Sequence, residues 1–285
     1  MLIFNKKSDL SAFLSPLIKQ NKSIGFVPTM GALHQGHLSL LKNSLSENDV
    51  TVMSIFVNPT QFNNAEDLDK YPRTLERDVQ IMQDLSNKII VYAPEVADIY
   101  EGNTVSENFN YDGLENQMEG KHRPGHFDGV GTIVKRLFEI VQPNKAYFGE
   151  KDWQQIAVVK ALVRYLGLKL QIVECDTIRE ADGLAKSSRN TLLAPDERAI
   201  APSIFKALKA SVEFAKTHTV KETHDKVVSD INAVDGLEVE YFQIVDGDSL
   251  QDVASWEDSA YVVGCITVYC GKTPIRLIDH IKYKG

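Results

Sequence analysis

Two histidines in a short glycine-containing turn are the residues of this chain best suited to chemistry. His34 and His37 are three residues apart, so both are expected to project from one face of the first turn of a helix. Gly36 stands between them and leaves room for a ligand to approach the backbone. A helix N-terminus also offers unpaired N–H groups and the positive end of the helix dipole. Two imidazole donors at such a place predict a polyphosphate site, and therefore a nucleotide site.

Two other interpretations of these histidines remain open at this stage. A pair at this spacing can bind zinc, although no third Cys, His or carboxylate ligand follows at a usual spacing. The two side chains can also serve only to cap the helix or to pack.

Four further segments gather polar or charged side chains. Residues 57–62 contain the neutral amides of Asn58 and Gln61, and residues 148–155 contain Lys151, a point charge suited to phosphate. Residues 121–129 form a polar, Gly- and Pro-rich segment before a long apolar helix, and residues 185–190 bring two cations and two hydroxyls together, which suits an anion. For each segment the alternative is an ordinary turn or a solvated loop.

Composition narrows the class of protein. The chain has 285 residues, of which 43% are hydrophobic and 25% charged, as in ordinary globular proteins. Its 31 Lys and Arg against 39 Asp and Glu give a formal charge of −8, which argues against a general nucleic-acid binder. Three cysteines without a CxxC pair, no signal-peptide pattern and no apolar run approaching the ~20 residues of a membrane span predict a cytoplasmic protein without structural disulfides.

The first part of the chain alternates strands and helices. Strands are predicted at 23–27, 51–57, 89–93, 146–148 and 170–175, and helices at 38–45, 75–85, 130–141 and 154–166, after an opening helix capped by Ser8. The strands are apolar along their length, which indicates a parallel sheet covered on both faces. Ligands bind at the carboxyl ends of such strands, where the polar segments fall.

The pattern changes after residue 193. Helices at 199–217 and 220–231 precede strands at 238–245, 261–270 and 274–279, which predicts a smaller α+β domain. We therefore expect an α/β domain over residues 1–175 and an α+β domain over residues 176–285.

Five segments, in this order, resemble the pantoate–β-alanine ligase family of the HxGH nucleotidyltransferase superfamily. They are Pro28-Thr29-Met30-Gly31-Ala32-Leu33-His34-Gln35-Gly36-His37, Val57-Asn58-Pro59-Thr60-Gln61-Phe62, Tyr71-Pro72-Arg73-Thr74, Phe148-Gly149-Glu150-Lys151-Asp152 and Ser187-Ser188-Arg189-Asn190. The resemblance implies a Rossmann-like first domain, a C-terminal domain acting as a lid, and a homodimer. The implied reaction is the condensation of pantoate with β-alanine to give pantothenate. It consumes ATP through a pantoyl-adenylate intermediate and releases AMP and pyrophosphate.

The resemblance also implies roles for individual residues. The expected catalytic residues are His34, His37, Lys151 and Arg189. The expected ATP-binding residues are Met30, Gly31, Ala32, Leu33, His34, Gln35, Gly36, His37, Gly149, Glu150, Lys151, Asp152, Ile178, Lys186, Ser187, Ser188 and Arg189. The expected residues for pantoate and β-alanine are Gln61, Gln155 and Asn58. No dedicated metal ligands are expected, because Mg²⁺ would be held mainly through the ATP phosphates.

One position departs from the family pattern, since Lys186 stands where members usually have Met. Two other functions remain as alternatives. The chain could transfer a nucleotide to a different acceptor, or it could be a nucleotide-binding regulator without catalysis. The amides of Gln61 and Gln155 argue against the first, and the presence of every motif argues against the second.

Overall fold

The structure is a computed structural model that describes residues 1–62 and 65–285. The chain divides into two compact units. The first comprises residues 1–149 and 158–175, and the second comprises residues 150–157 and 176–285. The sequence predicts a single domain boundary near Cys175. In the structure the second unit also includes the short segment 150–157.

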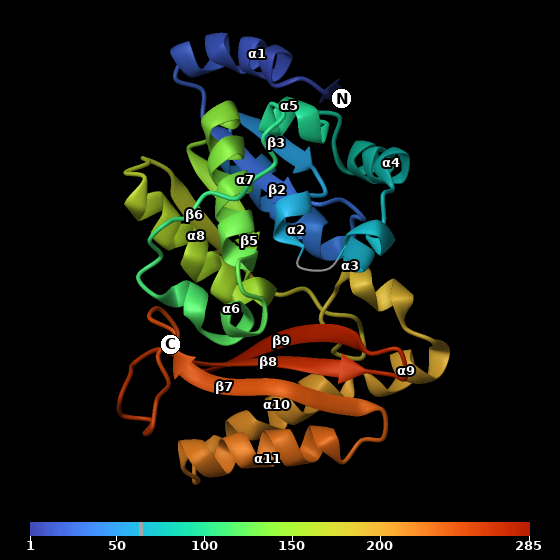
Figure 1. The fold of residues 1–285 in the computed structure, drawn as a ribbon, viewed down its shortest axis with the longest axis vertical. Coiled ribbons are helices and arrows are strands. Elements are labelled where there is room, and N and C mark those ends of the chain that lie inside the picture. Colours follow the sequence, from blue (N-terminus) through green and yellow to red (C-terminus); the bar gives the residue numbers. More distant parts are fainter. Residues whose placement is uncertain (63–64) are drawn as a thin grey trace. The chain divides into compact units, whose positions relative to one another are not determined.

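The first unit contains a six-stranded parallel sheet of order β1-β4-β3-β2-β5-β6 (Figure 1). The strands are β1 (Leu2–Phe4), β2 (Ile24–Thr29), β3 (Val50–Ile55), β4 (Ile89–Tyr92), β5 (Lys145–Gly149) and β6 (Gln171–Cys175). All four residues of β4 and the first four of β2 are buried, as expected for strands covered on both faces. The predicted α/β fold with a parallel sheet is confirmed.

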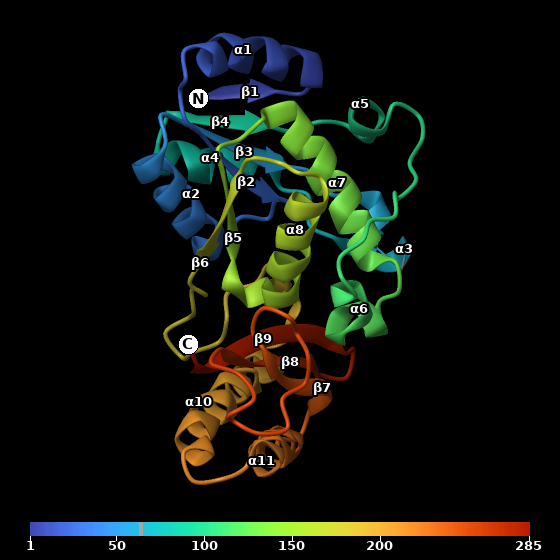
Figure 2. The same cartoon turned by 90° about the vertical axis from the view of Figure 1, so that its left-hand side faces the viewer.

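Helices cover both faces of this sheet. The helices in this part of the chain are α1 (Lys7–Lys19), α2 (Gln35–Glu47), α3 (Ala65–Lys70), α4 (Leu75–Leu85), α5 (Val96–Tyr100), α6 (Met118–His122), α7 (His126–Val141) and α8 (Trp153–Tyr165), and the first residues of α8 belong to the second unit. Figure 2 shows α2 and α4 on one face and α7 on the other. The predicted boundaries of α4 coincide with the observed ones, because an apolar stripe and Thr74 at the N-cap mark this helix locally.

The start of α1 differs from the prediction. The helix begins at Lys7, and the hydroxyl of Ser8 donates to the neighbouring Asp9 instead of capping the helix. The cap comes from elsewhere in the chain, since the backbone N–H of Lys7 donates to the carboxylate of Asp98 at 2.7 Å. The short strand β1 was not predicted, because its three residues carry too little pattern to be recognised.

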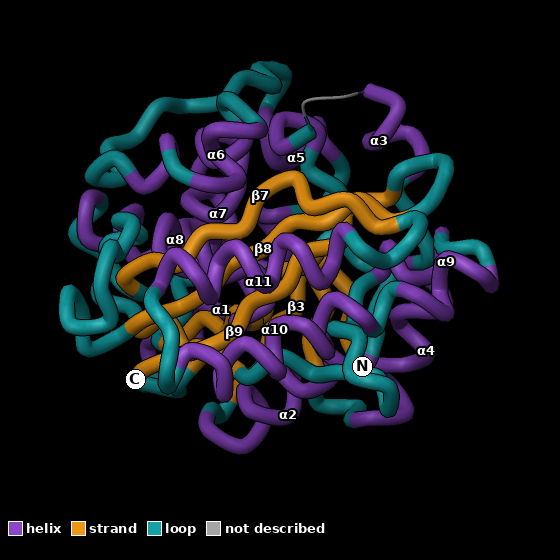
Figure 3. The backbone as a smooth tube through the Cα atoms, turned by 90° about the horizontal axis from the view of Figure 1, so that it is seen from below, coloured by secondary structure: helices purple, strands orange, loops and turns teal. Residues whose placement is uncertain are grey.

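The second unit is an α+β structure, as predicted. Figure 3 shows its antiparallel sheet of β7 (Leu237–Asp246), β8 (Val262–Cys270) and β9 (Ile275–Lys284) side by side in that order. Three helices, α9 (Pro195–Ile200), α10 (Ser203–Ala215) and α11 (Val220–Asn232), belong to the same unit. Across β7, β8 and β9, the Glu240 carboxylate accepts from the Tyr269 hydroxyl at 2.7 Å and from Nε of Arg276 at 2.9 Å.

The predicted single helix at 199–217 is wrong, since α9 ends at Ile200 and α10 begins at Ser203. Pro202 separates them, and proline cannot donate the backbone hydrogen bond that a continuous helix requires there.

The three cysteines are buried thiols. Burial raises the pKa of Cys265 to about 12, so this side chain stays protonated and unreactive at neutral pH. In the described part of the chain, none of the helices combines the length and apolar character that crossing a bilayer requires.

Candidate active site

The histidine turn begins at the carboxyl end of β2. Gly31 and Ala32 both adopt left-handed backbone conformations, with φ of 88° and 52°, and the chain then enters α2 at Gln35. The hydroxyl of Thr29 accepts from the N–H of Gly31 at 3.3 Å and donates to the carbonyl of Ser54 at 2.7 Å. The two side-chain bonds hold the start of the turn against the end of β3.

His34 and His37 are packed against each other at the N-terminus of α2. The helix starts three residues earlier than predicted, which makes His34 the N-cap residue rather than a member of the first turn. Nδ1 of His34 accepts the N–H of Gly36 at 3.1 Å, and Nδ1 of His37 accepts the N–H of His34 at 3.3 Å. In a neutral imidazole whose Nδ1 accepts, the proton resides on Nε2. Both rings therefore present Nε2–H as a hydrogen-bond donor.

Gly36 has a clear steric role in this arrangement. A Cβ atom at this position would lie 2.9 Å from both Cε1 and Nδ1 of His34. The sequence predicts that Gly36 leaves room for a ligand, but the His34 ring occupies that space.

The segment after β3 is anchored by Asn58, whose side chain is only 1% exposed. Its amide Nδ2 donates to the carbonyl of Gly129 at 3.1 Å, and Oδ1 accepts from the hydroxyls of Tyr100 at 2.5 Å and Thr60 at 3.2 Å. The backbone of α7 also approaches closely here, since a Cβ on Gly129 would lie 2.2 Å from the carbonyl oxygen of Thr60. All these contacts fix the short 3₁₀ turn Pro59–Gln61.

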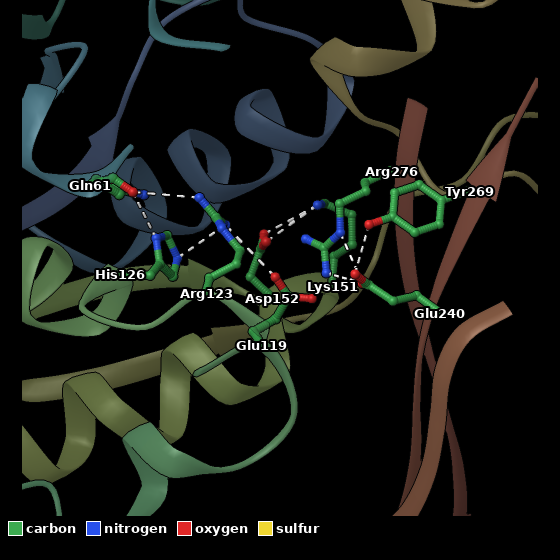
Figure 4. A network of polar contacts seen from close by, with 9 residues as sticks. All are labelled: Gln61, Glu119, Arg123, His126, Lys151, Asp152, Glu240, Tyr269 and Arg276. Carbon is green, nitrogen blue, oxygen red and sulfur yellow. Dashed lines mark hydrogen bonds and ion pairs between the residues drawn. The ribbon is translucent and has the colours of Figure 1, made fainter. Parts of the chain in front are cut away.

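Gln61 is held through its main chain, as Figure 4 shows. Its carbonyl oxygen accepts from Nδ1 of His126 at 2.9 Å and from Arg123 at 3.4 Å. Nη1 of Arg123 lies 3.4 Å from Nε2 of His126, and the same guanidinium pairs with Glu119 at 3.7 Å. His126 is thereby a donor at Nδ1 and an acceptor at Nε2, the opposite tautomer from His34 and His37. The half-buried side chain of Gln61 takes its direction from this fixed backbone.

A second group of predicted residues belongs to the second unit and begins with the 3₁₀ turn Glu150–Asp152. Glu150 is 8% exposed, and its carboxylate is 2.7 Å from Nζ of Lys282 and 3.8 Å from Nε2 of His280. The neighbouring His280 imidazole and the pairing with Lys282 lower the pKa of Glu150 to about 2, against the opposing effect of burial. The Glu150 carboxylate thus fastens the turn to β9.

The other two charges of this turn face each other. Nζ of Lys151 lies 3.3 Å from the carboxylate of Asp152 (Figure 4). The neighbouring Trp153 donates its indole N–H to the carbonyl of Gly247 at 3.0 Å, and its ring lies 5.2 Å from that of His280. Gln155, two residues further on, is half-buried in the same unit.

The remaining predicted residues lie on a hairpin and the turn that follows it. The backbone N–H of Lys186 donates to the carbonyl of Ile178 at 2.9 Å, so these two residues are cross-strand neighbours. The ammonium of Lys186 pairs with Glu180 at 2.7 Å. Ser187 caps the next 3₁₀ turn, Ser188–Leu192, by accepting the N–H of Arg189 at 3.2 Å.

The sheet topology explains why the histidine turn, the Asn58–Gln61 segment and Gly149 lie together. β2 is the strand at which the chain order reverses, with β3 on one side and β5 on the other. Parallel strands end at the same edge, so the turn after β2, the Asn58–Gln61 segment after β3 and Gly149 at the end of β5 leave the sheet from one side. Ligands of open α/β sheets bind at such a switch point.

Asp78 was missed by the sequence reasoning. Its buried carboxylate accepts the N–H groups of Ala32 and Leu33, within the histidine turn. The available signal was a carboxylate on the apolar face of the predicted helix at 75–85, four residues before Met82. Considering only the described residues, no group of three His, Cys, Asp or Glu side chains is arranged to hold a metal ion.

Comparison with known proteins gives a consistent result. The family model described as pantoate-beta-alanine ligase matches residues 2–282. The pantothenate synthetases of Bacteroides thetaiotaomicron and Flavobacterium psychrophilum are each 53% identical over 284 residues, covering 100% of this chain and 99% and 100% of theirs. The crystal structure of pantothenate synthetase from Thermus thermophilus is 38% identical, covers 100% of both chains and superposes with a TM-score of 0.91.

A further solved structure is the pantoate-beta-alanine ligase from Francisella tularensis complexed with beta-gamma ATP and beta-alanine. It is 37% identical with a TM-score of 0.78, covering 99% of this chain and 98% of that one. Since the similarity extends over the whole length in both sequence and fold, this chain belongs to the pantoate–β-alanine ligase family, the enzymes that form pantothenate from pantoate and β-alanine.

Proposed function

We propose that this ligase activates pantoate with ATP. In the first step a carboxylate oxygen of pantoate attacks the α-phosphorus of ATP, forming pantoyl adenylate while the α–β phosphoanhydride bond breaks and pyrophosphate leaves. In the second step the amine of β-alanine attacks the adenylate carbonyl, the amide bond of pantothenate forms, and AMP leaves. The relative from Francisella tularensis complexed with beta-gamma ATP and beta-alanine supports both substrates.

The observation that carries the proposal is the pair of Nε2–H donors on His34 and His37 at the N-terminus of α2. Pantoate's carboxyl group, with a pKa of about 4 or below, is ionised at pH 7 and needs no base. The barrier is the repulsion between this anion and the ATP phosphates. Two imidazole donors and the helix N-terminus offset that repulsion and stabilise the departing pyrophosphate.

We assign ATP binding to the residues that the family resemblance implies. In the first unit these are Met30, Gly31, Ala32, Leu33, His34, Gln35, Gly36, His37 and Gly149. In the second unit they are Glu150, Lys151, Asp152, Ile178, Lys186, Ser187, Ser188 and Arg189. Lys151 and Arg189 supply positive charge for the phosphates, and Glu150 acts through its contact with Lys282, which holds the turn. ATP enters with Mg²⁺ bound to its phosphate oxygens, as MgATP.

Gln61 and Gln155 are assigned to pantoate, and Gln61 also to β-alanine. A neutral amide can fix the direction of the carboxylate without neutralising the charge that attacks phosphorus, whereas a lysine would lower its nucleophilicity. Gln61→Lys is therefore expected to lower the rate of adenylate formation even if pantoate still binds. A wild-type rate in that variant would contradict this assignment. Asn58 supports Gln61 from within the protein, because its amide is buried and hydrogen-bonded to Gly129 and Tyr100.

β-Alanine is mostly an ammonium ion at pH 7 and must lose a proton before it attacks. His34 and His37 carry their proton at Nε2 when neutral, so in that tautomer this atom donates and does not accept. We propose that a phosphate oxygen or solvent accepts the proton that β-alanine loses.

A pyrophosphate-release assay tests the proposal. The purified protein is incubated with ATP, Mg²⁺ and pantoate, with and without β-alanine, and the products are identified by mass. We expect pyrophosphate when pantoate is present without β-alanine. Pantothenate and AMP should appear only after β-alanine is added. Absence of pyrophosphate from protein that still binds ATP would contradict the adenylate route.

The family resemblance further leads us to propose that the protein works in the cytoplasm as a homodimer and that the second unit acts as a lid. Light scattering across a concentration series tests the dimer. A monomer at the concentrations used for the activity assay would contradict it.

A further inference from the structure

The geometry of the histidine turn needs an explanation beyond its own sequence. Ala32 has a φ of 52° directly after Gly31 at 88°. A left-handed conformation suits glycine but is disfavoured for a residue with a Cβ atom. Contacts from outside the turn must therefore hold Ala32 in place.

Asp78, in the first turn of α4, makes those contacts. Its Oδ2 accepts the N–H of Ala32 at 2.9 Å, and its Oδ1 accepts the N–H of Leu33 at 2.8 Å. The side chain is 0% exposed, so these bonds do not compete with water. Gly31 gives the carboxylate room, because a Cβ there would lie 3.1 Å from Oδ2.

The hydrogen bond between Leu33 and Asp78 lies next to the histidines in the chain. Leu33, fixed by Asp78, is followed by His34, whose own N–H donates to Nδ1 of His37. A shift of the Leu33 backbone would move the His34 N–H and release the bond that fixes the His37 tautomer. Asp78 is thus connected to the orientation of both imidazoles through two successive backbone amides.

The segment Tyr71-Pro72-Arg73-Thr74, one of the sequence motifs without an assigned role, supports Asp78 in turn. The hydroxyl of Thr74 donates to Oδ2 of Asp78 at 3.1 Å. The guanidinium of Arg73 donates to the carbonyls of Tyr71 and Leu68, each at 3.2 Å, which shapes the chain just before α4. A carboxylate with three hydrogen-bond donors is held in one orientation.

We propose that Asp78 is a positioning residue for the reaction: it sets the backbone of the histidine turn and thereby aims Nε2–H of His34 and His37 at the nucleotide phosphates. This inference rests on the proposed function for its kinetic consequence. Its structural part, the link between the Asp78 carboxylate and the two histidine tautomers, stands independently of which reaction is catalysed.

Asp78→Asn tests the proposal with almost no change in shape. An asparagine amide can accept through its oxygen only, and its NH₂ group would face a backbone N–H. We expect kcat for pyrophosphate release to fall about 100-fold, as for a misplacement of catalytic groups by about 1 Å, while KM for pantoate changes less than threefold. In ¹⁵N-histidine NMR spectra, His34 and His37 should change from the Nε2–H form to a mixture of tautomers.

Met82→Ala is the matched control, because Met82 is also 0% exposed and lies one turn further along α4. It should lower the melting temperature but leave kcat within threefold of wild type below that temperature, with both histidine tautomers unchanged. An equal loss of kcat in the two variants at equal fractions of folded protein would reduce Asp78 to a structural residue. Wild-type kcat and tautomers in Asp78→Asn would overturn the proposal.

Thr74→Val provides a milder variant if Asp78→Asn does not fold. It removes one of the three hydrogen bonds to the carboxylate, so we expect a two- to tenfold loss of kcat that Thr74→Ser restores. Equal activity of the Val and Ser variants would contradict the proposal. If wild-type protein released no pyrophosphate while the tautomers responded to Asp78→Asn as expected, the proposed function would fail and the positioning role would stand.

Discussion

The imidazole rings of His34 and His37 lie with their centroids 4.1 Å apart, inclined by 35°, and each accepts a backbone N–H of the same helix start through Nδ1. The two side chains therefore cap the helix and present donors at the same time. Capping and ligand binding, which are alternatives in the sequence, are compatible in the structure because the two ring nitrogens have different partners.

Replacing His37 by alanine removes one of these donors. We expect His37→Ala to lower kcat about 10²–10³-fold, the usual effect of losing a donor that stabilises the transition state. Pyrophosphate release under saturating ATP and pantoate measures this. His224→Ala on α11, where the imidazole is partly exposed and contacts Asp225, is the control and should keep wild-type kcat. A loss of less than threefold in His37→Ala would exclude the assigned role.

Arg189→Ala separates catalysis from substrate binding. We expect adenylate formation to slow at least tenfold, because one of the cations that offset the phosphate charge is lost. The Kd for pantoate, measured by calorimetry, should change less than threefold. An equal loss in the rate of adenylate formation and in the affinity for pantoate would contradict a role for Arg189 limited to nucleotide binding.

Lys186→Met restores the residue that the family usually has. Lys186 already pairs with Glu180 at 2.7 Å, so its charge is largely compensated before any nucleotide binds. The ATP assignment of Lys186 therefore concerns its backbone rather than its ammonium, and we expect KM for ATP to change less than threefold in steady-state assays. Arg189→Ala serves as the comparison, and a tenfold rise in KM for Lys186→Met would show instead that its ammonium contacts phosphate.

Asn58→Ala removes three hydrogen bonds that hold the Gln61 turn. The carbonyl of Gly129 loses the Asn58 donor and the hydroxyl of Tyr100 keeps only its contact with Thr60, which should lower the free energy of unfolding by about 1–3 kcal/mol. KM for pantoate should rise about tenfold, because Gln61 loses its support. Asn144→Ala is the control: its side chain accepts the N–H of Ile24 at the opposite end of β2, so it should affect stability without changing this KM. A pantoate KM that rises equally in both variants would refute the specific link to Gln61.

Glu150→Gln should change how stability depends on pH. The pKa of Glu150 is lowered from about 4.5 to about 2 in the folded protein, so the unfolded chain binds more protons between these values. Its contribution of about 3 kcal/mol is complete above pH 4.5 and is lost as the pH falls toward 2. The unfolding free energies of Glu150→Gln and wild type should therefore differ at pH 7 and converge in acid.

Urea denaturation followed by tryptophan fluorescence measures this difference, because Trp153 and Trp256 both belong to the second unit. Glu213→Gln, which breaks an exposed ion pair with Lys216, is the control and should change stability by at most about 0.5 kcal/mol. A Glu150→Gln difference that stays constant from pH 7 to pH 2 would contradict the assigned ion pair.

Sequence reasoning succeeded where the determinants are local. The apolar stripe of α4, the continuous apolar strands and the histidine turn are all recognisable within a few residues. The break between α9 and α10 is also marked locally, by Pro202, although apolar residues continue across it.

The missed features depend on contacts between distant residues. Lys7 is capped by a carboxylate 91 positions away, and His126 reaches the carbonyl of Gln61 across 65 positions. The polar segment that contains His126 was open to interpretation as a solvated loop, because nothing within it specifies its partner. Such pairings are set by the folded topology, which a single sequence does not reveal.

The second unit is assembled from two separate stretches of the chain, and this has a practical consequence for protein engineering. Chimaeras that exchange only residues 176–285 between family members would pair Lys282, His280 and the Gly247 carbonyl with a foreign Glu150 turn and Trp153. A functional exchange has to include residues 150–157 as well. A truncated gene beginning at residue 176 would likewise encode a protein whose strand β9 lacks its acidic partner Glu150, so the stretches 150–157 and 176–285 have to be exchanged together while residues 158–175 stay with the first unit.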